Sequence, residues 1–205
     1  MEHSESNNKN SILESQMQFC LELDKEKEIY RQTYISSASR KENDAEHAWH
    51  MAVMALILGD YSNQNIDLLK TISMILMHDV VEIDAGDTYA YDEEAKKTQK
   101  ERELRAADRL YGLLTKEQAE KFKNLWLEFE EQKTPEAKFA RAMDNIQPIM
   151  LNAATDGKAW EEHGVHLSSI LKRNAHTADG SEELWKYAKE KFVDKNVASG
   201  KILED

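Results

Sequence analysis

Two histidines and two aspartates of the chain lie on helical faces that are otherwise apolar, and none has an obvious counter-ion. They are His47, His78, Asp79 and Asp144. Burying an imidazole or a carboxylate costs free energy unless a bond or an opposite charge offsets it. Imidazole nitrogens and carboxylate oxygens together suit a divalent first-row metal ion, whose charge two aspartates balance. The residue types therefore predict a site for one divalent metal ion, with ligands drawn from three helices.

Each of these residues also has an ordinary structural interpretation. A buried histidine is usually hydrogen-bonded in a core, and an aspartate can satisfy a helix end. Neighbouring residues on a helix point about 100° apart, so His78 and Asp79 can bind one ion only if it lies between their two directions. The identity of the ion stays open, because this ligand set accepts Mn, Co, Fe, Zn, Ni or Mg.

Two further acids follow the adjacent His78 and Asp79. Glu82 lies four residues after His78 and three after Asp79, so it projects over the same face. Asp87 follows Gly86, a turn residue that allows it to point back toward the same site. Near a metal-activated water such a pair suits hydrolysis, in which one acid activates the water and the other assists the leaving group. The alternative is a helix end that leads into a solvated acidic loop.

The elements that must position these residues are predicted to be helices. Only seven glycines and two prolines occur in 205 residues, which argues against a sheet-rich fold with many tight turns. Apolar periodicity and capping residues predict helices at about residues 12–30, 45–61, 67–81, 92–114, 165–174 and 181–198, and two more that begin at Thr115 and at Thr134-Pro135. Residues 11–205 are predicted to form one all-α domain, a compact helical bundle, and residues 1–10 a disordered tail.

Two segments near the N-terminus have simple patterns. In the helix at about residues 12–30, apolar residues recur at helical spacing and are expected to face the core. These residues are Leu13, Met17, Cys20 and Leu21. Residues 31–40 are polar and rich in serine, which predicts a loop.

The charge of the chain narrows the class of ligand. Lys and Arg number 27 against 39 Asp and Glu, a formal charge of −12. Long nucleic acid is disfavoured because it would demand a basic surface, whereas a small anion is compatible where an arginine or a metal ion concentrates positive charge. The single Cys20 excludes an intrachain disulfide and a cysteine-based zinc cluster. Neither a membrane span nor a signal peptide is predicted, so a cytoplasmic protein is expected.

The order of the four candidate ligands resembles a known signature. His47, then the adjacent His78 and Asp79, then the distant Asp144 look like the H…HD…D signature of HD-domain metal-dependent phosphohydrolases. The resemblance runs from about residue 13 to residue 155, which is most of the domain. It implies an all-α bundle of the HD-domain type with a mononuclear site, in which these four residues are the metal ligands.

Further residues resemble the bacterial 5′-deoxynucleotidase branch of that superfamily. The matching pieces are Arg31, Glu46-His47, His78-Asp-x-x-Glu82 and Gly86-Asp87. In that branch a homodimer is usual, and the arginine that Arg31 matches orients the substrate phosphate, a role that suits a planar forked donor. An ordinary surface charge is the alternative for Arg31. Arg40 aligns with a second family arginine, whose role here stays open.

The chain departs from the bacterial enzymes where sugar and base would sit. Gln32 replaces a tryptophan that follows the phosphate-orienting arginine, and the residues from Thr88 onward replace a proline-bearing loop. The resemblance makes Arg31, Gln32, Asp87 and Thr88 the expected substrate contacts. The exclusion of ribonucleotides stays open.

The resemblance and the residues together predict hydrolysis of a 5′-deoxynucleoside monophosphate to the deoxynucleoside and phosphate. Glu82 would help to activate water, and Asp87 would assist the departing 5′-oxygen. The rival predictions are an HD-type hydrolase of nucleotide di- or triphosphates or of an alarmone, a non-catalytic nucleotide sensor, and a structural dimer whose metal only braces helices. His50, three residues after His47, is expected in the core rather than at the metal.

Overall fold

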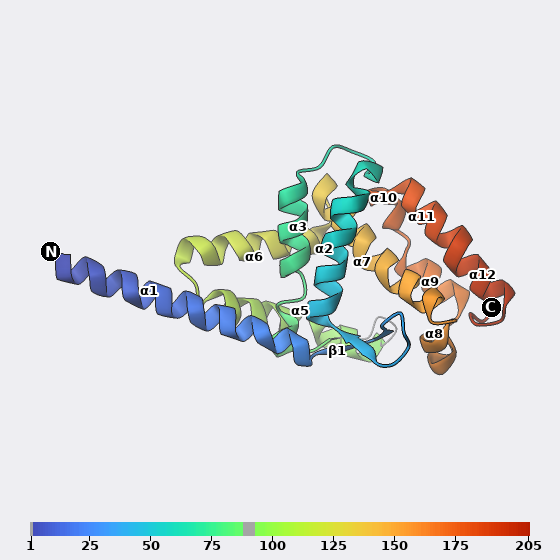
Figure 1. The fold of residues 1–205 in the computed structure, drawn as a ribbon, viewed down its shortest axis with the longest axis horizontal. Coiled ribbons are helices and arrows are strands. Elements are labelled where there is room, and N and C mark those ends of the chain that lie inside the picture. The colour runs from blue at the N-terminus through green and yellow to red at the C-terminus, as the bar shows by residue number, and fades with distance from the viewer. Residues whose placement is uncertain (1, 88–92) are drawn as a thin grey trace.

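Helix α7 runs through the middle of the molecule, and other helices pack around it (Figure 1). The structure is a computed structural model that describes residues 2–87 and 93–205. The central helix α7 (Pro135–Ala154) contacts α2 (Asp44–Leu58), α3 (Leu68–Met77), α6 (Lys116–Glu131) and α10 (Thr177–Gly180). Small residues allow this close packing, since Ala137, Ala140 and Ala142 of α7 are fully buried.

The remaining elements are mostly helical. The other helices are α1 (Glu2–Leu23), α4 (Glu82–Ala85), α5 (Glu93–Tyr111), α8 (Lys158–His163), α9 (Leu167–Arg173), α11 (Glu182–Ala188) and α12 (Asp194–Ala198). Two 3₁₀ segments, η1 (Asp24–Glu28) and η2 (Gly59–Tyr61), and a π-helical segment, η3 (Lys189–Val193), connect them. The described chain has only two strands, β1 (Tyr30–Tyr34) and β2 (Lys41–Asn43), which pair antiparallel. The predicted all-α class is confirmed, and no helix in the described part is long and apolar enough to span a membrane.

Five of the described helices begin at a capping residue. The side chains of Asn43, Asp67, Thr115, Thr134 and Ser181 each accept a hydrogen bond from the backbone amide three residues later. Asn43 forms a capping box with Glu46, whose carboxylate accepts from the Asn43 amide. These caps fix where α2, α3, α6 and α7 begin, and therefore which faces of α2 and α7 carry the candidate site residues.

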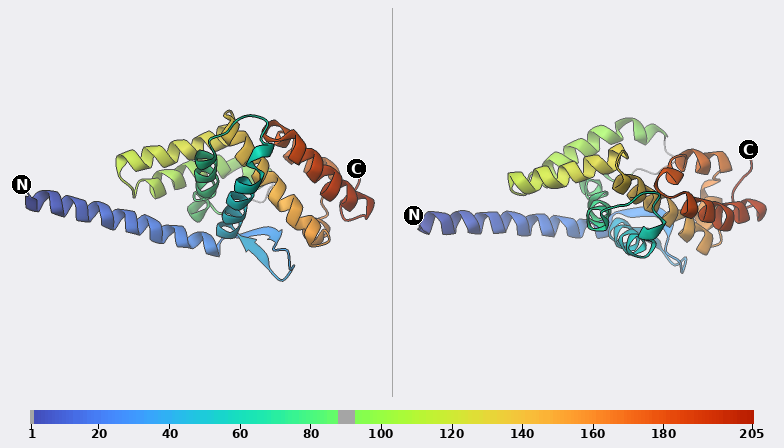
Figure 2. Two further views of the ribbon diagram at one scale, coloured as in Figure 1. Left: turned by 45° about the horizontal axis from the view of Figure 1, so that its top comes forward. Right: turned by 90° about the horizontal axis from the view of Figure 1, so that it is seen from above.

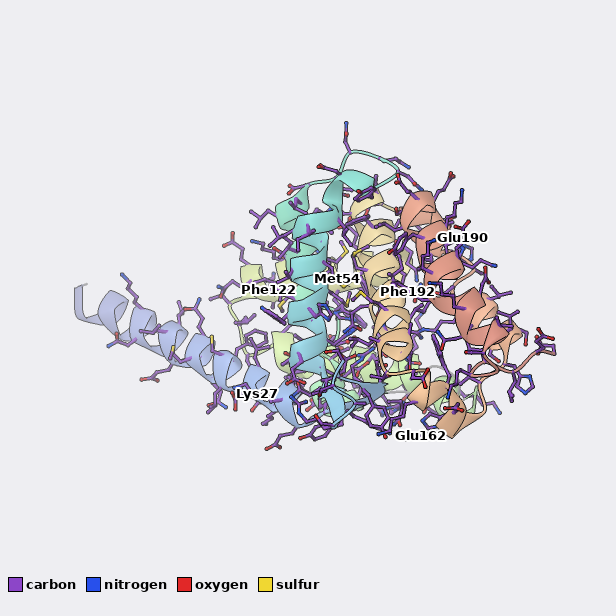
Figure 3. The ribbon with its side chains drawn as sticks, turned by 45° about the vertical axis from the view of Figure 1, so that its right-hand side comes forward. Lys27, Met54, Phe122, Glu162, Glu190 and Phe192 are labelled. Carbon is purple, nitrogen blue, oxygen red and sulfur yellow. The ribbon has the colours of Figure 1, made fainter. Side chains whose placement is uncertain are left out.

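The core has two parts, and the segment after α3 joins them. Ile75, near the end of α3, packs in the larger cluster with side chains of α2 and α7, among them Met54 (Figure 3). Val80 packs in the smaller cluster with side chains of α5 and α6. His78 and Asp79 lie between these two anchors, so packing on both sides holds the segment in place.

Helix α3 ends at Met77, four residues before its predicted end at Val81. The Nδ1 atom of His78 lies 2.6 Å from the carbonyl oxygen of Ile75, the acceptor that the Asp79 amide would use in a continued helix. The imidazole therefore takes the place of a backbone bond. The turn that follows frees His78 and Asp79 from the helical geometry that the sequence predicts for them.

The N-terminal helix also differs from its prediction. α1 begins at Glu2, so residues 2–10 are helical where a disordered tail is predicted, and the helix ends at Leu23. Its predicted core face is exposed, as the side chains of Leu13, Met17, Cys20 and Leu21 show. Phe19 is buried instead. The N-terminal part of α1 extends beyond the other helices in both views of Figure 2, so the rest of the described chain does not cover this face.

A short hairpin replaces the loop predicted at residues 31–40. Tyr30, Thr33 and Tyr34 belong to β1, and aromatic and β-branched residues favour strands. Thr33 is buried, and Tyr30 pairs with Asn43 of β2. The hairpin places Arg31 against the start of α2, where its guanidinium pairs with Asp44.

Candidate active site

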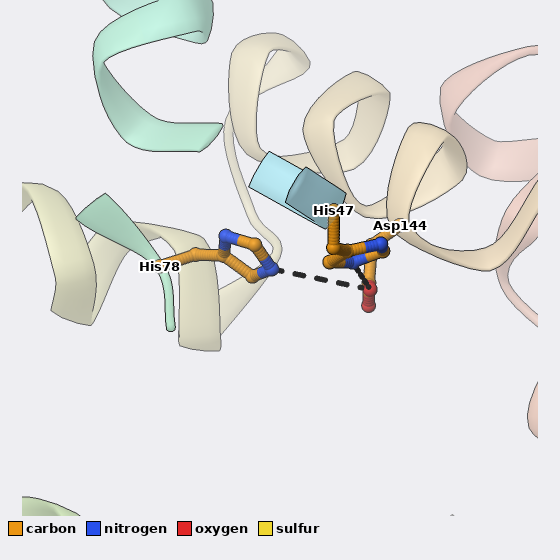
Figure 4. Close-up of side chains that lie close together, drawn as sticks. All are labelled: His47, His78 and Asp144. Atoms are coloured by element: carbon orange, nitrogen blue, oxygen red, sulfur yellow. Dashed lines mark hydrogen bonds and ion pairs between the residues drawn. The ribbon is translucent and has the colours of Figure 1, made fainter. Parts of the chain in front are cut away.

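Three of the predicted ligand residues converge from three elements (Figure 4). His47 comes from α2, His78 from the turn after α3 and Asp144 from α7, and one potential ligand atom of each lies within 4.8 Å of the other two. The distance to Asp144 Oδ1 is 3.2 Å from His47 Nε2 and 4.0 Å from His78 Nε2. All three residues are buried. The fold therefore brings residues nearly 100 positions apart in the sequence to one point.

Asp79, the fourth predicted ligand, lies beside these three residues. Its Oδ2 is 2.9 Å from His78 Nε2 and 2.8 Å from Arg31 Nη1. The guanidinium of Arg31 also reaches Asp44, with Nη1 3.3 Å from Oδ1, and lies 4.0 Å from Asp144 Oδ1. Arg31 is thus surrounded by carboxylates, and these hold its pKa well above the ordinary value against the opposing effect of burial.

The hydrogen bonds of His47 determine which ring nitrogen can bind a metal. Gln147 Oε1 lies 3.0 Å from His47 Nδ1, and Gln147 Nε2 donates a hydrogen bond to Glu42 Oε2 at 2.9 Å. A carboxylate only accepts, so Glu42 orients the amide with its oxygen toward His47. His47 Nδ1 then carries the proton, and Nε2 presents a lone pair to Asp144.

His78 is oriented in the same way by the backbone. The carbonyl oxygen of Ile75 can only accept, so His78 Nδ1 donates to it at 2.6 Å. His78 Nε2 has no hydrogen-bond partner among the described residues, although Asp79 Oδ2 lies close to it. Each Nε2 atom therefore faces a carboxylate oxygen, where either a proton on the ring or a shared cation offsets the negative charge. Imidazole nitrogens and carboxylate oxygens that converge in this way fit a divalent metal ion.

The two histidines differ in pKa. Burial, together with the nearby charge of Arg31, lowers the pKa of His47 to about 4. Burial also lowers the pKa of His78, but Asp79 and Asp144 outweigh this effect and raise it to about 9. Binding of a metal ion at His78 would therefore release a proton at neutral pH, whereas binding at His47 would not.

Two buried acids stand next to the candidate ligands. Glu82 and Asp44 have carboxylate oxygens within 4.8 Å of Asp79 and of each other. Burial raises the pKa of Glu82 well above its ordinary value, and Asp79 and Asp44 add to the rise. Burial, and then Asp79, raise the pKa of Asp44 to about 8. Acids that hold a proton near neutral pH can both accept and donate one, as acid–base catalysis requires.

Two adjoining pockets open at this group. The acidic pocket is lined by the candidate ligands and acids, with His78, Asp79, Glu82, Asp144 and Arg141 among them. The amide pocket is lined by Gln32, Asn145, Asn152, Trp160 and Asn174, together with apolar side chains. Three residues line both pockets, namely Arg31, Asp87 and Arg173. A ligand with an anionic end and a larger polar and aromatic end would match this pair of pockets.

The predicted substrate contacts fall along these pockets as far as the structure describes them. Arg31 and Asp87 lie at the junction, and Gln32 lines the amide pocket. Burial raises the pKa of Asp87, although Arg31 partly opposes the rise. The carboxamide oxygen of Gln32 accepts a hydrogen bond from Lys41. Thr88 lies outside the described residues.

Several residues around the site were not singled out from the sequence. They are Glu42, Asp44, Arg141, Gln147 and Arg173. Arg141 and Gln147 lie three residues before and after Asp144, so helical spacing was an available signal for both. Asp44 resembles an ordinary acid in the first turn of a helix, and Arg173 has no spacing relation to the other site residues.

Other predicted residues lie away from the ligand group. Arg40 forms two hydrogen bonds with Glu46, one of 2.7 Å, and its side chain is about half exposed. His50 is half-buried rather than in the core, and its Nδ1 lies 3.2 Å from Gln147 Nε2. His50 therefore supports the amide that orients His47, rather than joining the ligand group itself.

Comparisons with known proteins agree with this geometry. The HD domain family model matches residues 23–185. Curated relatives include the 5′-deoxynucleotidase HDDC2 of Danio rerio, 32% identical over 109 residues, which cover 53% of this chain and 53% of the relative. The Xenopus laevis protein of the same name is 32% identical over 122 residues, 60% of this chain and 57% of the relative. The chain thus spans about half the length of the curated relatives it matches.

Solved structures extend the comparison to nearly the whole chain. A crystal structure named as a predicted metal-dependent phosphohydrolase from Magnetospirillum magnetotacticum MS-1 is 43% identical, with a TM-score of 0.89, over 94% of this chain and 96% of that one. A conserved hypothetical protein from Pyrococcus furiosus shares the fold, at 19% identity and a TM-score of 0.59. With its family model, its ordered histidines and aspartates and its helical architecture, this chain belongs to the HD domain family.

Proposed function

We propose that this chain is a metal-dependent phosphomonoesterase that hydrolyses 5′-deoxynucleoside monophosphates to the deoxynucleoside and phosphate. The observation that carries the proposal is the convergence of two imidazole Nε2 atoms on Asp144 Oδ1, beside the buried acid Glu82 and the guanidinium of Arg31. The names of the curated relatives support the choice of substrate class.

In this proposal His47, His78, Asp79 and Asp144 hold one divalent ion. A bound ion supplies Lewis acidity, which lowers the pKa of water and offsets negative charge on phosphoryl oxygens. The hydrogen bonds of Gln147 and of the Ile75 carbonyl keep both ring planes aimed at the ion before it arrives. Mn, Co, Fe, Zn, Ni and Mg are all candidates for its identity.

The remaining residues handle the substrate and its protons. Arg31, on β1, binds and orients the phosphate with its planar fork of donors. Glu82 accepts a proton from the attacking water, and Asp87, at the mouth of both pockets, delivers a proton to the departing 5′-oxygen. The sugar and base occupy the amide pocket, in contact with Gln32. Thr88, outside the described residues, stays a predicted substrate contact.

A phosphate-release assay tests this function. Protein loaded with each candidate ion is offered deoxy- and ribonucleoside monophosphates, and nucleoside di- and triphosphates, while phosphate and pyrophosphate are measured separately. The expected result is phosphate release from the deoxynucleoside monophosphates. Pyrophosphate release from triphosphates would instead indicate the rival hydrolase, and tight binding of nucleotide without turnover would indicate a sensor.

We also infer that the protein forms a homodimer through the exposed apolar face of α1. Leu13, Met17 and Leu21 of α1 are each more than half exposed. An exposed apolar face of this kind is typical of an interface. Replacing Met17 and Leu21 with Glu should convert a dimer into a monomer in light scattering. A wild-type chain that is monomeric at micromolar concentration would contradict this inference.

A cytoplasmic location is part of the proposal, because nucleoside monophosphates are metabolites of the cell interior. Fractionation of cells that express the tagged protein tests it, with the activity expected in the cytosolic fraction. Activity confined to a membrane or secreted fraction would contradict it.

A further inference from the structure

Three arginines line the acidic pocket, Arg31, Arg141 and Arg173, and Arg173 has the fewest ion-pair partners among the described residues. Arg31 binds Asp79 at 2.8 Å and Asp44 at 3.3 Å. Arg141 binds Asp144 Oδ2 and Glu130 at 3.0 Å each, and its guanidinium lies 4.1 Å from the ring centre of Phe129. Among the described residues, the only carboxylate within 4 Å of Arg173 is Asp144, whose Oδ2 is 3.9 Å from Nη2. Its donors are therefore the most available for a ligand.

The backbone holds Arg173 firmly at this position. Arg173 is the last residue of α9, and the next residue, Asn174, is buried and donates to the Ile170 carbonyl at 2.8 Å. Asn174 Oδ1 also accepts from Thr177, which in turn accepts from Asn145 of α7. This chain of bonds ties the end of α9 to the helix that carries Asp144. The backbone of Arg173 is thus held at the junction, and its side chain, about 30% exposed, is accessible to a ligand.

The negative charge around the acidic pocket explains why a second guanidinium would favour the binding of phosphate. Six acids line the acidic pocket, namely Asp79, Glu82, Asp87, Glu103, Glu130 and Asp144, and two more, Glu42 and Asp44, lie beside it. A phosphate dianion entering these surroundings is repelled unless fixed positive charge offsets the acids. Arg31 already neutralises its own neighbours, so most of its charge is balanced before substrate arrives.

We propose that Arg173 is a second phosphate-binding arginine, which contacts the phosphate of the nucleotide from the α9 side while Arg31 contacts it from the β1 side. The two guanidiniums approach different oxygens of Asp144, Oδ2 and Oδ1 respectively. A group seated next to Asp144 is therefore within reach of both. The inference rests on the proposed function, because it takes the anion to be the substrate phosphate.

The test compares Arg173→Met with Arg173→Lys and with a matched control, Arg105→Met, on the exposed face of α5. Inorganic phosphate binding to the metal-loaded proteins is measured by calorimetry, metal affinity by chelator competition, and inhibition by deoxynucleoside in the hydrolysis assay. A charge-assisted hydrogen bond contributes about 1.5–3 kcal/mol, so the Kd for phosphate should rise about 10- to 100-fold in Arg173→Met. Arg173→Lys should recover part of the loss, Arg105→Met should match wild type, and metal affinity should stay unchanged in all three.

Two results would overturn the assignment. If Arg173→Met weakens the metal as much as the phosphate, Arg173 only supports Asp144. If it weakens inhibition by deoxynucleoside and leaves phosphate binding intact, Arg173 contacts the nucleoside. The proposed function fails separately, through absent phosphate release by the wild-type protein, since the calorimetric comparison does not depend on turnover.

Discussion

Gln147 should control metal affinity without touching the metal, and replacing it tests how the site is built. Its side chain is fully buried, and its oxygen receives the Nδ1 proton of His47 at 3.0 Å. Its Nε2 lies 2.9 Å from Glu42 Oε2 and 3.2 Å from His50 Nδ1. Gln147→Met keeps the length of the side chain but removes these bonds, so His47 loses the partner that selects its tautomer.

The magnitude follows from these contacts. Loss of a residue that orients a ligating histidine typically costs about 10- to 100-fold in metal affinity. Leaving Glu42 and His47 Nδ1 buried without their partner should also lower the free energy of unfolding by about 3 kcal/mol. Gln147→Glu keeps an acceptor for His47 but removes the donor to Glu42, so it should retain more metal affinity than Gln147→Met while losing similar stability.

Chelator competition and urea unfolding measure the two effects separately. Gln118→Met, in the first turn of α6 and away from the site, is the control and should change neither metal affinity nor ligand geometry. If Gln147→Met unfolds more easily yet binds metal as tightly as wild type, Gln147 is only a packing residue. Gln147 would then not select the tautomer of His47.

Three further predictions concern other parts of the site. Asp79→Ala should abolish metal binding and activity and leave the circular dichroism of the helices largely intact. Activity equal to that of the wild type would contradict a metal-dependent mechanism. Burial raises the pKa of Glu26 to about 7, and the negative charge of Asp79 adds to the rise. Between pH values of about 4.5 and 7 the folded state therefore binds a proton that the unfolded state does not, and the free energy of unfolding falls as the pH rises. Glu26→Gln should therefore gain up to about 3 kcal/mol over wild type across that interval in urea unfolding, and a gain independent of pH would refute the assignment. Gln32→Trp should lower kcat/KM for ribonucleotides more than for deoxynucleotides. An equal change for both would show that residue 32 does not distinguish ribose from deoxyribose.

The ligand group could be predicted because its residues conflict with their surroundings. His47 and Asp144 interrupt apolar helical faces, and burial cost together with residue type indicated a metal. Caps at Asn43 and Thr134 placed the starts of the two helices that carry these residues. Such local signals were sufficient for the fold class, whereas the prediction of the ligand group also depended on the resemblance to the phosphohydrolase signature.

Signals that depend on distant neighbours were missed. The end of α3 depends on a side-chain bond from His78 to a backbone carbonyl, which periodicity does not show. Arg173 reaches the site only because α10 packs against α7. On α1 the expected apolar face is exposed and Phe19 is buried, because the helix packs against α5 with the face that carries Phe19. Apolar spacing alone does not distinguish a core face from one that a second subunit covers.

A metal titration of activity tests the central claim most directly. Metal-stripped protein is titrated with Mn²⁺ or Co²⁺ while phosphate release from a deoxynucleoside monophosphate is followed. One site built from His47, His78, Asp79 and Asp144 predicts no activity before metal is added, and a linear rise that ends at one ion per chain. Activity in the stripped protein, or a rise that continues to two ions per chain, would contradict this account.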